Sequence, residues 1–228
     1  MELAVFGATG DTGRELTAQA GNRGHDIRAL TRSPASFSTG SAITIIQGNV
    51  LDPEAVSATV EGVDAVCCLL GRTQNNPDDI VSRGTAHIVT AMERHCVERL
   101  VVLTSMGLGG SMCTVPWYVR LANATVLADL MADKARQEEQ VMQSELDWTI
   151  VRPGGLTDEP RTGEYVHGVD VDVNAGPIPR ADVAEFLLWV LENEQYVHEA
   201  PSLTTERDID IPFLWDQATG VVQRLAGR

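Results

Sequence analysis

The chain has 228 residues, of which 43% are apolar and 21% charged, the balance of a folded globular protein rather than a disordered one. Its net charge of −15 argues against nucleic acid and anionic membrane surfaces as partners. No apolar run approaches the roughly 20 residues of a membrane span. The cysteines have no zinc or disulfide spacing, and the N-terminus enters a strand directly, so we expect no metal, reduced thiols and a cytoplasmic location.

The basic residues are unusual, because only one of the 17 is a lysine, Lys134, and the others are arginines. Together with the acidity, this scarcity suggests adaptation to a halophilic, high-salt cytoplasm, although GC-rich coding also favours arginine over lysine. A lone lysine is either a chance residue on a solvated helix face or a position where a compact ammonium does what a guanidinium cannot.

The predicted elements alternate between strand and helix along the chain. Apolar segments predict strands at 3–7, 26–32, 42–50, 64–71, 99–105 and 146–153. Helical spacing appears between them, at 13–22, 53–62, 79–95 and 121–144. The strands are apolar without alternation, which is typical of a parallel sheet covered by helices on both faces. We therefore predict an α/β fold with a Rossmann-type, doubly wound parallel sheet.

The remainder of the chain is a small C-terminal addition to the same domain. After Pro153 we expect a loop, a helix near 181–192, a possible strand at 200–204 and a final short helix. No internal repeat or linker is visible, so a single domain is expected over residues 1–228. About residues 153–228 would contribute its substrate-side wall and the C-terminal helices.

The segment "AVFGATGDTGREL" joins the first predicted strand to the first predicted helix. Gly7, Gly10 and Gly13 form a G-x-x-G-x-x-G pattern in it. Such glycines permit a tight turn, let the backbone approach a pyrophosphate and bring the helix against the strand. The helix N-terminus then offers N–H groups and partial positive charge to the phosphates. The strand before and the helix after favour a dinucleotide-binding loop over a plain turn.

The end of the second strand indicates which dinucleotide binds. NAD enzymes usually place an acidic residue there, roughly 20 residues after the loop, to hold the adenosine ribose hydroxyls. Here Thr31 takes that place and Arg32 follows, so a guanidinium is available for a 2′-phosphate and for stacking on adenine. We expect NADP as the cofactor, with NAD the less favoured alternative.

Several stretches of the chain combine into a family pattern. They are "GATGDTGR" from Gly7, "GNVLD" from Gly48, "LTSMG" from Leu103, "DKARQEEQVMQSELDWTIVRPGGLT" from Asp133 and "IPRADVAEFL" from Ile178. On these residues the chain resembles the atypical short-chain dehydrogenase/reductases, in the NmrA-like and biliverdin-reductase-B-like branch. The resemblance implies a cofactor site made of Gly7, Thr9, Gly10, Asp11, Thr12, Gly13, Arg32, Asn49, Val50, Leu69, Leu70, Gly71, Thr104, Lys134, Pro153 and Gly154.

Within that set, Asn49 stands where the family more often has aspartate, and the resemblance implies that Asn49 and Val50 border the adenine. Leu69 to Gly71, ending the fourth strand, would line the cofactor cleft. Tyr118, Tyr165 and His167 lie in stretches expected near the substrate, although packed or solvated side chains are the alternative.

The resemblance also gives Lys134 a role. The family's lysine lies on the helix after the fifth strand, four residues before a glutamate, as Lys134 and Glu138 do here, and in relatives it donates to the nicotinamide ribose hydroxyls. In the fully catalytic enzymes it also lowers the pKa of a tyrosine four residues earlier. That position is Leu130 here, so the usual proton donor is missing. Ser105 resembles the family's serine and would orient a substrate carbonyl, unless it merely ends a strand. The candidate catalytic residues are thus Lys134 and Ser105.

Two classes of function stay open. The first is an NADPH-dependent oxidoreductase that passes hydride to a small conjugated acceptor such as a flavin, quinone or linear tetrapyrrole. Such an acceptor needs no tyrosine acid, and the cofactor carries the chemistry. The second is a non-catalytic NADP(H)-binding redox sensor, as NmrA-like regulators are. Leu130 and the short C-terminal part disfavour a nucleotide-sugar epimerase. We expect an unknown small-molecule substrate and a monomer or homodimer.

Overall fold

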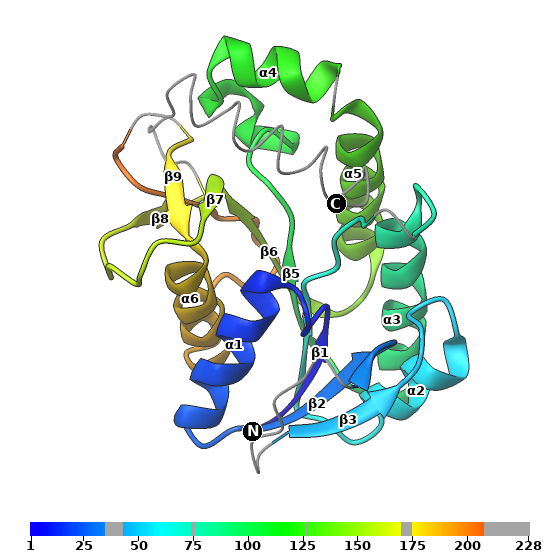
Figure 1. The fold of residues 1–228 in the computed structure, drawn as a ribbon. Helices are drawn as coiled ribbons and strands as arrows, with labels where there is room; N and C mark the ends of the chain where they lie inside the picture. The colour runs from blue at the N-terminus through cyan, green and yellow to red at the C-terminus, as the bar shows by residue number, and fades with distance from the viewer. Residues whose placement is uncertain (35–42, 74–75, 126, 170–174, 208–228) are drawn as a thin grey trace.

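The computed structural model describes residues 1–34, 43–73, 76–125, 127–169 and 175–207, with only the main chain of Tyr118. Its main sheet has the strand order β3-β2-β1-β4-β5-β6-β10-β8 (Figure 1). These strands are β3 (Ile43–Gln47), β2 (Asp26–Thr31), β1 (Glu2–Phe6), β4 (Ala65–Cys68), β5 (Arg99–Leu103), β6 (Asp147–Pro153), β10 (Ser202–Thr204) and β8 (Val166–Gly168). All neighbours pair in parallel except β8, which is antiparallel to β10. This order confirms the predicted Rossmann-type sheet.

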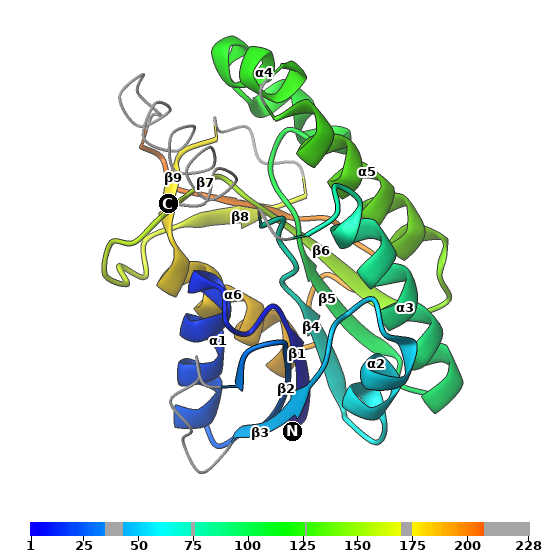
Figure 2. The same ribbon diagram turned by 45° about the vertical axis from the view of Figure 1, so that its right-hand side comes forward.

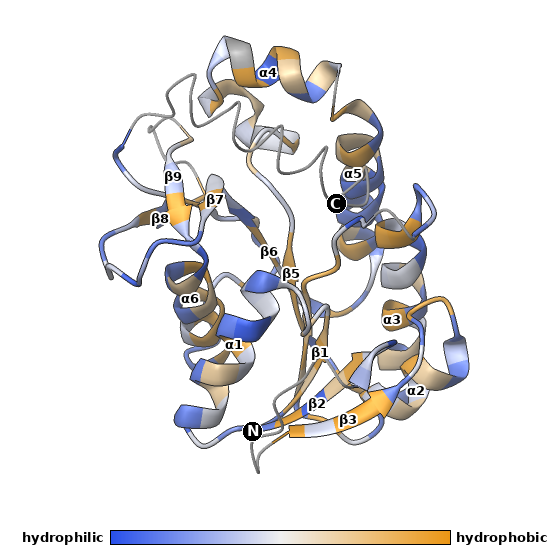
Figure 3. Cartoon of the chain, in the orientation of Figure 1, coloured by the Kyte–Doolittle hydropathy of each residue, from blue (hydrophilic) through white to orange (hydrophobic). Residues whose placement is uncertain are grey.

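Helices cover both faces of the sheet (Figure 2). On one face α1 packs against α6, and on the other α3 lies between α2 and α5. Their bounds are α1 (Asp11–Asn22), α2 (Pro53–Val60), α3 (Ile80–His95), α5 (Ala128–Gln143) and α6 (Arg180–Glu192). Hydrophobic residues run along the central strands (Figure 3), and successive strand residues feed two separate cores. Val5 and Cys67 face α1 and α6, whereas Phe6 and Cys68 face the opposite layer.

The parallel strands bring their carboxyl ends to one edge of the sheet. β1 lies between β2 and β4, so the chain leaves it at the point where the strand order reverses. In open α/β sheets, ligands bind in the crevice outside the carboxyl ends at this switch point. The fold therefore gathers the segments that follow β1 to β6 on a single edge.

The predicted helix over 121–144 is wrong, because the structure has two helices there. A 3₁₀ helix (η2, Gly109–Thr114) leads into α4 (Trp117–Ala124), and α5 begins only at Ala128. The Thr125 hydroxyl donates to the Leu121 carbonyl at 2.7 Å, and the Leu127 N–H reaches back to Ala122 O at 3.0 Å. The main-chain bond closes the end of α4, and the hydroxyl bond is of a kind that often bends a helix. In Figures 1 and 2, α4 projects from the body beyond the carboxyl edge.

The region after Pro153 contains more strand than predicted. In place of the expected loop, β7 (Gly155–Thr157) pairs in parallel with β9 (Pro177–Pro179), and β8 extends the main sheet. Each of these strands has three residues, too few for a periodicity to show in the sequence. The predicted final short helix lies outside the described residues. Within the described ranges, no helix combines the length and apolar character that a membrane crossing requires.

Candidate functional site

In the loop between β1 and α1, close contacts inside the protein leave no room for a side chain at two of the glycines. Gly7 has a φ of +86°, and a Cβ there would lie 2.3 Å from the Leu69 carbonyl oxygen. A Cβ at Gly13 would lie 2.2 Å from the Gly7 carbonyl oxygen and 2.7 Å from Ala8 Cα. These glycines let β1, the end of β4 and the first turn of α1 pack closely.

Gly10 is different, because an added Cβ there would make a tight contact but no overlap with the protein. Its φ of −70° suits any residue, and the nearest atom to an added Cβ is Gly7 O at 3.3 Å. Gly10 is the N-cap of α1, and no side-chain hydrogen bond caps the helix. A missing side chain beside an uncapped helix N-terminus is what a bound phosphate requires. The loop therefore fits the pyrophosphate of a dinucleotide, with Thr9 partly exposed and Thr12 buried beside it.

Asp11, in the first turn of α1, belongs to a cluster of charges at this end of the molecule. The buried Arg180 at the start of α6 lies 4.0 Å from the Asp11 carboxylate and forms an ion pair with Asp158. Asp182 accepts hydrogen bonds from Thr162 and from a neighbouring main-chain N–H. Arg180 thus ties the phosphate loop to the chain that follows β7.

The predicted adenine side lies beyond the ends of β2 and β3. Arg32 is exposed and donates to Asn76 Oδ1 at 2.6 Å. Arg32 follows β2 and Asn76 follows β4, so this hydrogen bond joins the segments on either side of β1. Asn49 is exposed, and its side-chain oxygen accepts from the Leu51 N–H at 3.1 Å. Val50 is 8% exposed. The guanidinium is therefore accessible to a 2′-phosphate at the edge where the adenosine would lie.

Leu69, Leu70 and Gly71 form the segment that leaves β4. The two leucines are partly buried and Gly71 is exposed. The Leu69 N–H donates to Phe6 O at 2.8 Å, and Leu70 approaches Gly84 of α3 so closely that a Cβ there would lie 2.8 Å from Leu70 Cδ1. This segment therefore adjoins the phosphate loop, and its role as a cleft wall, which the resemblance implies, stays a prediction.

Lys134 is held at the carboxyl end of β5. Its Nζ donates to the Thr104 carbonyl oxygen at 2.8 Å. Burial lowers the pKa of Lys134 from 10.5 to about 8, although Glu138, Cys68 and Asp133 each act to raise it. The ammonium is thus anchored by the main chain and only partly exposed, which excludes a freely solvated lysine.

Three buried side chains form a hydrogen-bonded chain that begins at Thr104. The Thr104 hydroxyl donates to Glu138 Oε1 at 2.7 Å. Arg152 of β6 donates to both oxygens of the same carboxylate, from Nε at 3.0 Å and from a terminal nitrogen at 2.7 Å. Thr104, Glu138 and Arg152 are respectively 3%, 4% and 6% exposed. Such a bidentate, charge-assisted pair fixes both partners in orientation as well as distance.

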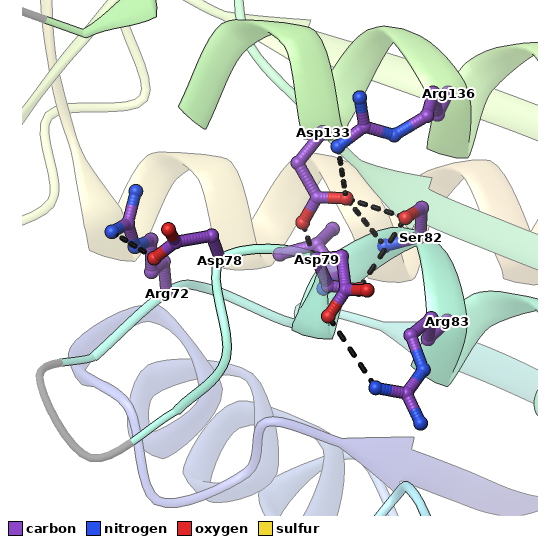
Figure 4. A network of polar contacts seen from close by, with 8 residues as sticks. Arg72, Asp78, Asp79, Ser82, Arg83, Asp133 and Arg136 are labelled. Carbon is purple, nitrogen blue, oxygen red and sulfur yellow. Dashed lines mark hydrogen bonds and ion pairs between the residues drawn. The ribbon is translucent and has the colours of Figure 1, made fainter. Parts of the chain in front are cut away.

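Asp133 fixes the turn of α5 that carries Lys134. Its carboxylate, fully buried, accepts hydrogen bonds from the main-chain N–H groups of Val81 at 2.9 Å and Ser82 at 3.3 Å, in the first turn of α3. Figure 4 shows the carboxylate between the two helices, with the Ser82 hydroxyl and Arg136 as further partners. One helix thus caps the N-terminus of its neighbour, and this sets the position of α5 over the sheet edge.

The remaining predicted residues have contacts that serve the fold. Ser105 donates from Oγ to Met106 O at 3.2 Å. The Pro153 carbonyl accepts from the Met106 N–H at 2.9 Å. A Cβ at Gly154 would lie 2.1 Å from Gly176 O. These contacts explain Pro153 and Gly154 by packing, while Ser105 keeps its place next to Thr104 at the end of β5. Tyr165 and His167 belong to an aromatic cluster with Phe186, Trp189 and Tyr196.

Two features of the part of the chain that the structure describes bear on the kind of ligand that it binds. No group of three or more His, Cys, Asp or Glu side chains there is placed to hold a metal ion. A shallow depression of about 380 Å³ lies beside α5, lined by Asp78, Asp79, Asp129, Ala132 and Arg136. Its acidic lining repels an anionic cofactor, so this depression does not fit a dinucleotide.

Sequence reasoning missed Asp133 and Asn76 and underrated Arg152. A charged residue inside the apolar segment "DWTIVRP" signals a buried partner. The spacing of Lys134 and Glu138 places both on one face of a helix. Nothing in the sequence identifies the partners of Asn76 or Asp133, because these lie on other elements.

Comparisons with known proteins agree with this geometry. Residues 7–194 match the sequence profile of the NAD(P)H-binding family. A (4-alkanoyl-5-oxo-2,5-dihydrofuran-3-yl)methyl phosphate reductase from Streptomyces griseus is 31% identical over 220 residues, covering 90% of this chain and 70% of the relative. The photosystem II assembly factor Ycf39 from Synechocystis is 28% identical over 68% of this chain and 45% of its own length.

Among solved structures, the anaerobillin reductase ChuY from Escherichia coli O157:H7 superposes with a TM-score of 0.78 at 21% identity, covering 92% of this chain and 99% of that one. At this identity the likeness shows a common fold. The profile match over residues 7–194 and the relative of 31% identity show the family as well as the fold. The chain belongs to the NAD(P)H-binding family of Rossmann-fold proteins, in agreement with the predicted resemblance to the atypical short-chain dehydrogenase/reductases.

Proposed function

We propose that this protein is an NADPH-dependent reductase that passes hydride to a small conjugated acceptor. The observation that carries the proposal is the anchored ammonium of Lys134 at the carboxyl edge of the sheet, on a helix whose Leu130 occupies the usual position of the tyrosine acid. An oxidoreductase activity is consistent with family membership and with a relative named as a reductase.

Different residues at the carboxyl edge of the sheet would bind different parts of the cofactor. The loop around Gly10 would hold the pyrophosphate with main-chain N–H groups, and Arg32 would bind the 2′-phosphate. Lys134 would donate to the nicotinamide ribose hydroxyls while Thr104 O holds the ammonium in place. When bound, the reduced nicotinamide supplies the hydride.

The side chain at position 130 narrows the choice of acceptor. Leucine has no proton to donate, so a simple ketone would lack the acid that its alkoxide product needs. An electron-poor conjugated molecule, such as a flavin, a quinone or a linear tetrapyrrole, spreads the added charge and takes a proton from water. We expect Ser105 to orient the acceptor rather than to protonate it.

The first test is a fluorescence titration of the protein with NADPH and with NADH in molar salt. We expect NADPH to bind at least about tenfold more tightly, since a 2′-phosphate gains a charge-assisted contact with Arg32. Arg32→Ala should remove this preference, whereas Arg94→Ala, an exposed arginine at the far end of α3, should keep it. Equal binding of both dinucleotides would rule out the role of Arg32.

Turnover separates the reductase from the second candidate, a non-catalytic redox sensor, which the likeness to an assembly factor favours. A reductase should oxidise NADPH with FMN or a quinone, and Lys134→Ala should slow it by about tenfold or more. Tight NADPH binding without turnover on any acceptor would favour the sensor. The monomeric or homodimeric state, the cytoplasmic location and the halophilic adaptation stay predictions.

A further inference from the structure

The position of the Lys134 ammonium depends on a residue that itself needs support. Lys134 Nζ donates to the main-chain oxygen of Thr104, the first residue after β5. The Thr104 N–H pairs with Val151 O at 2.9 Å, but its side chain is held only through Glu138, which accepts the hydroxyl proton at 2.7 Å. Among the described residues, Glu138 is therefore the side-chain partner of Thr104, whose main-chain oxygen Lys134 contacts from the same helix.

Glu138 is in turn fixed by a buried guanidinium. Arg152 donates hydrogen bonds to both carboxylate oxygens of Glu138, and the two side chains are 7% and 5% exposed, respectively. Gly109 of η2 makes room for the guanidinium, since a Cβ there would lie 2.6 Å from a terminal nitrogen of Arg152. Apolar residues of similar volume commonly replace a buried ion pair without loss of stability. Stability alone therefore does not explain a pair at this position, whereas orientation of the carboxylate toward Thr104 does.

We propose that Glu138, clamped by Arg152, is a positioning residue that sets the place of the Lys134 ammonium by holding Thr104. The inference rests on the proposed function for its ligand, because it concerns the nicotinamide ribose that Lys134 would bind. Glu138 does not itself contact that ligand; it acts through the threonine.

The charges around Lys134 make this role measurable. On α5 the ammonium is faced by Glu138 and Asp133, and on β4 by the thiol of Cys68. Arg136 is paired with Asp133 and Arg152 with Glu138, so each carboxylate has its own arginine. Because Glu138 acts to raise the pKa of Lys134, its loss should lower that pKa further.

The chain provides an unusually clean probe, because Lys134 is its only lysine. Feeding ¹³C-labelled lysine gives a single Cε signal, whose shift against pH reports the Lys134 titration without any cofactor. The variants are Glu138→Gln, which removes the charge, and Thr104→Val, which keeps the Glu138–Arg152 pair and removes only the hydroxyl. The matched control is Glu139→Gln, the same change at the exposed neighbour on α5.

We expect Glu138→Gln to lower the titration midpoint by about one pH unit. Thr104→Val should weaken NADPH binding about fivefold to tenfold by fluorescence titration, and Glu139→Gln should change neither quantity. An unchanged midpoint in Glu138→Gln, or wild-type NADPH affinity in Thr104→Val, would overturn the proposal. If Glu138→Gln does not fold, Thr104→Val decides alone. A wild-type protein that fails to bind NADPH but gives the expected midpoints would refute the proposed function and leave the positioning of Lys134 by Glu138 intact.

Discussion

The two ends of the candidate site are built in different ways. At the phosphate end, the candidate residues form one continuous segment from Gly7 to Gly13, where main-chain N–H groups at the start of α1 would meet the ligand. At the lysine end, the ammonium depends on Thr104 of the β5 edge, Glu138 of α5 and Arg152 of β6. The first surface is local in the chain, and the second exists only after distant elements have packed.

This difference indicates which substitutions each binding surface tolerates. A site made of main-chain groups tolerates substitutions at its non-glycine positions. It does not tolerate a Cβ at its glycines, because there the backbone must approach its own neighbours and the ligand. A buried side-chain network tolerates added bulk at its margins but not the loss of one partner, which leaves another uncompensated. Mutations should therefore act on folding and binding in different proportions at the two ends.

The largest effect is expected at Gly7. Gly7→Ala places a Cβ 2.3 Å from a carbonyl oxygen at a φ of +86°, so we expect a loss of about 3 kcal/mol in the free energy of unfolding. Gly21→Ala in α1 is the matched control, because nothing lies within 4 Å of its Cβ. It should stabilise by about 0.5 kcal/mol. Chemical denaturation of both variants gives the answer, and equal stabilities would contradict the close packing of the loop.

A smaller effect is expected at the lysine end and depends on pH. Burial lowers the pKa of Lys134 to about 8, so below pH 8 the charge is present in both states and its burial opposes folding in full. Between pH 8 and 10.5 only the unfolded chain keeps the proton, so the contribution of Lys134 to the free energy of unfolding rises with pH. Lys134→Met should stabilise by about 2 kcal/mol at pH 7, and the gain should fade toward pH 10.5.

The comparison with wild type is needed because other groups titrate nearby. Burial raises the pKa of Cys67 to about 12 and also raises that of Cys68, so stability falls above pH 9 as unfolded thiols ionise. The loss at Cys67 is common to both proteins and cancels in the difference, whereas Cys68 interacts with the Lys134 charge, so the change in the gain is measured between pH 7 and pH 9. Arg120→Met, at an exposed position, should show no pH-dependent gain. A gain at Lys134 that is constant with pH would show that charge burial is not its cause.

The smallest effect sharpens the comparison at Gly10. Gly10→Ala brings a Cβ to 3.3 Å from Gly7 O and puts a poorer N-cap residue at the start of α1, so the free energy of unfolding should fall by only about 0.5 to 1 kcal/mol. A methyl group at the place of a phosphate should nevertheless weaken NADPH binding about tenfold or more, which is 1.4 kcal/mol. Fluorescence titration and denaturation of the same variant measure both quantities. Unimpaired NADPH binding would mean that no phosphate approaches Gly10.

The sequence predicted the elements of the sheet well, because each is a local pattern. The six strands from β1 to β6 and most of the helices between them follow from apolar runs and helical spacing. The break between α4 and α5 was missed, since the main-chain bond from Leu127 to Ala122 that closes α4 has no glycine or proline nearby to signal it in the sequence. The short strands β7 and β9 were missed because their pairing partners, and not their own residues, define them.

The candidate site divides along the same line. By itself the sequence determined the glycine loop, the missing acidic residue after β2 and the leucine at position 130, because backbone conformation and residue type at a fixed spacing are properties of the chain alone. Only the tertiary structure decided that Arg32 meets Asn76 and that Asp133 caps α3. It also decided that Glu138 joins Arg152 to Thr104. These contacts join residues from different elements, and which side chains meet in the interior depends on how the sheet and its helices pack.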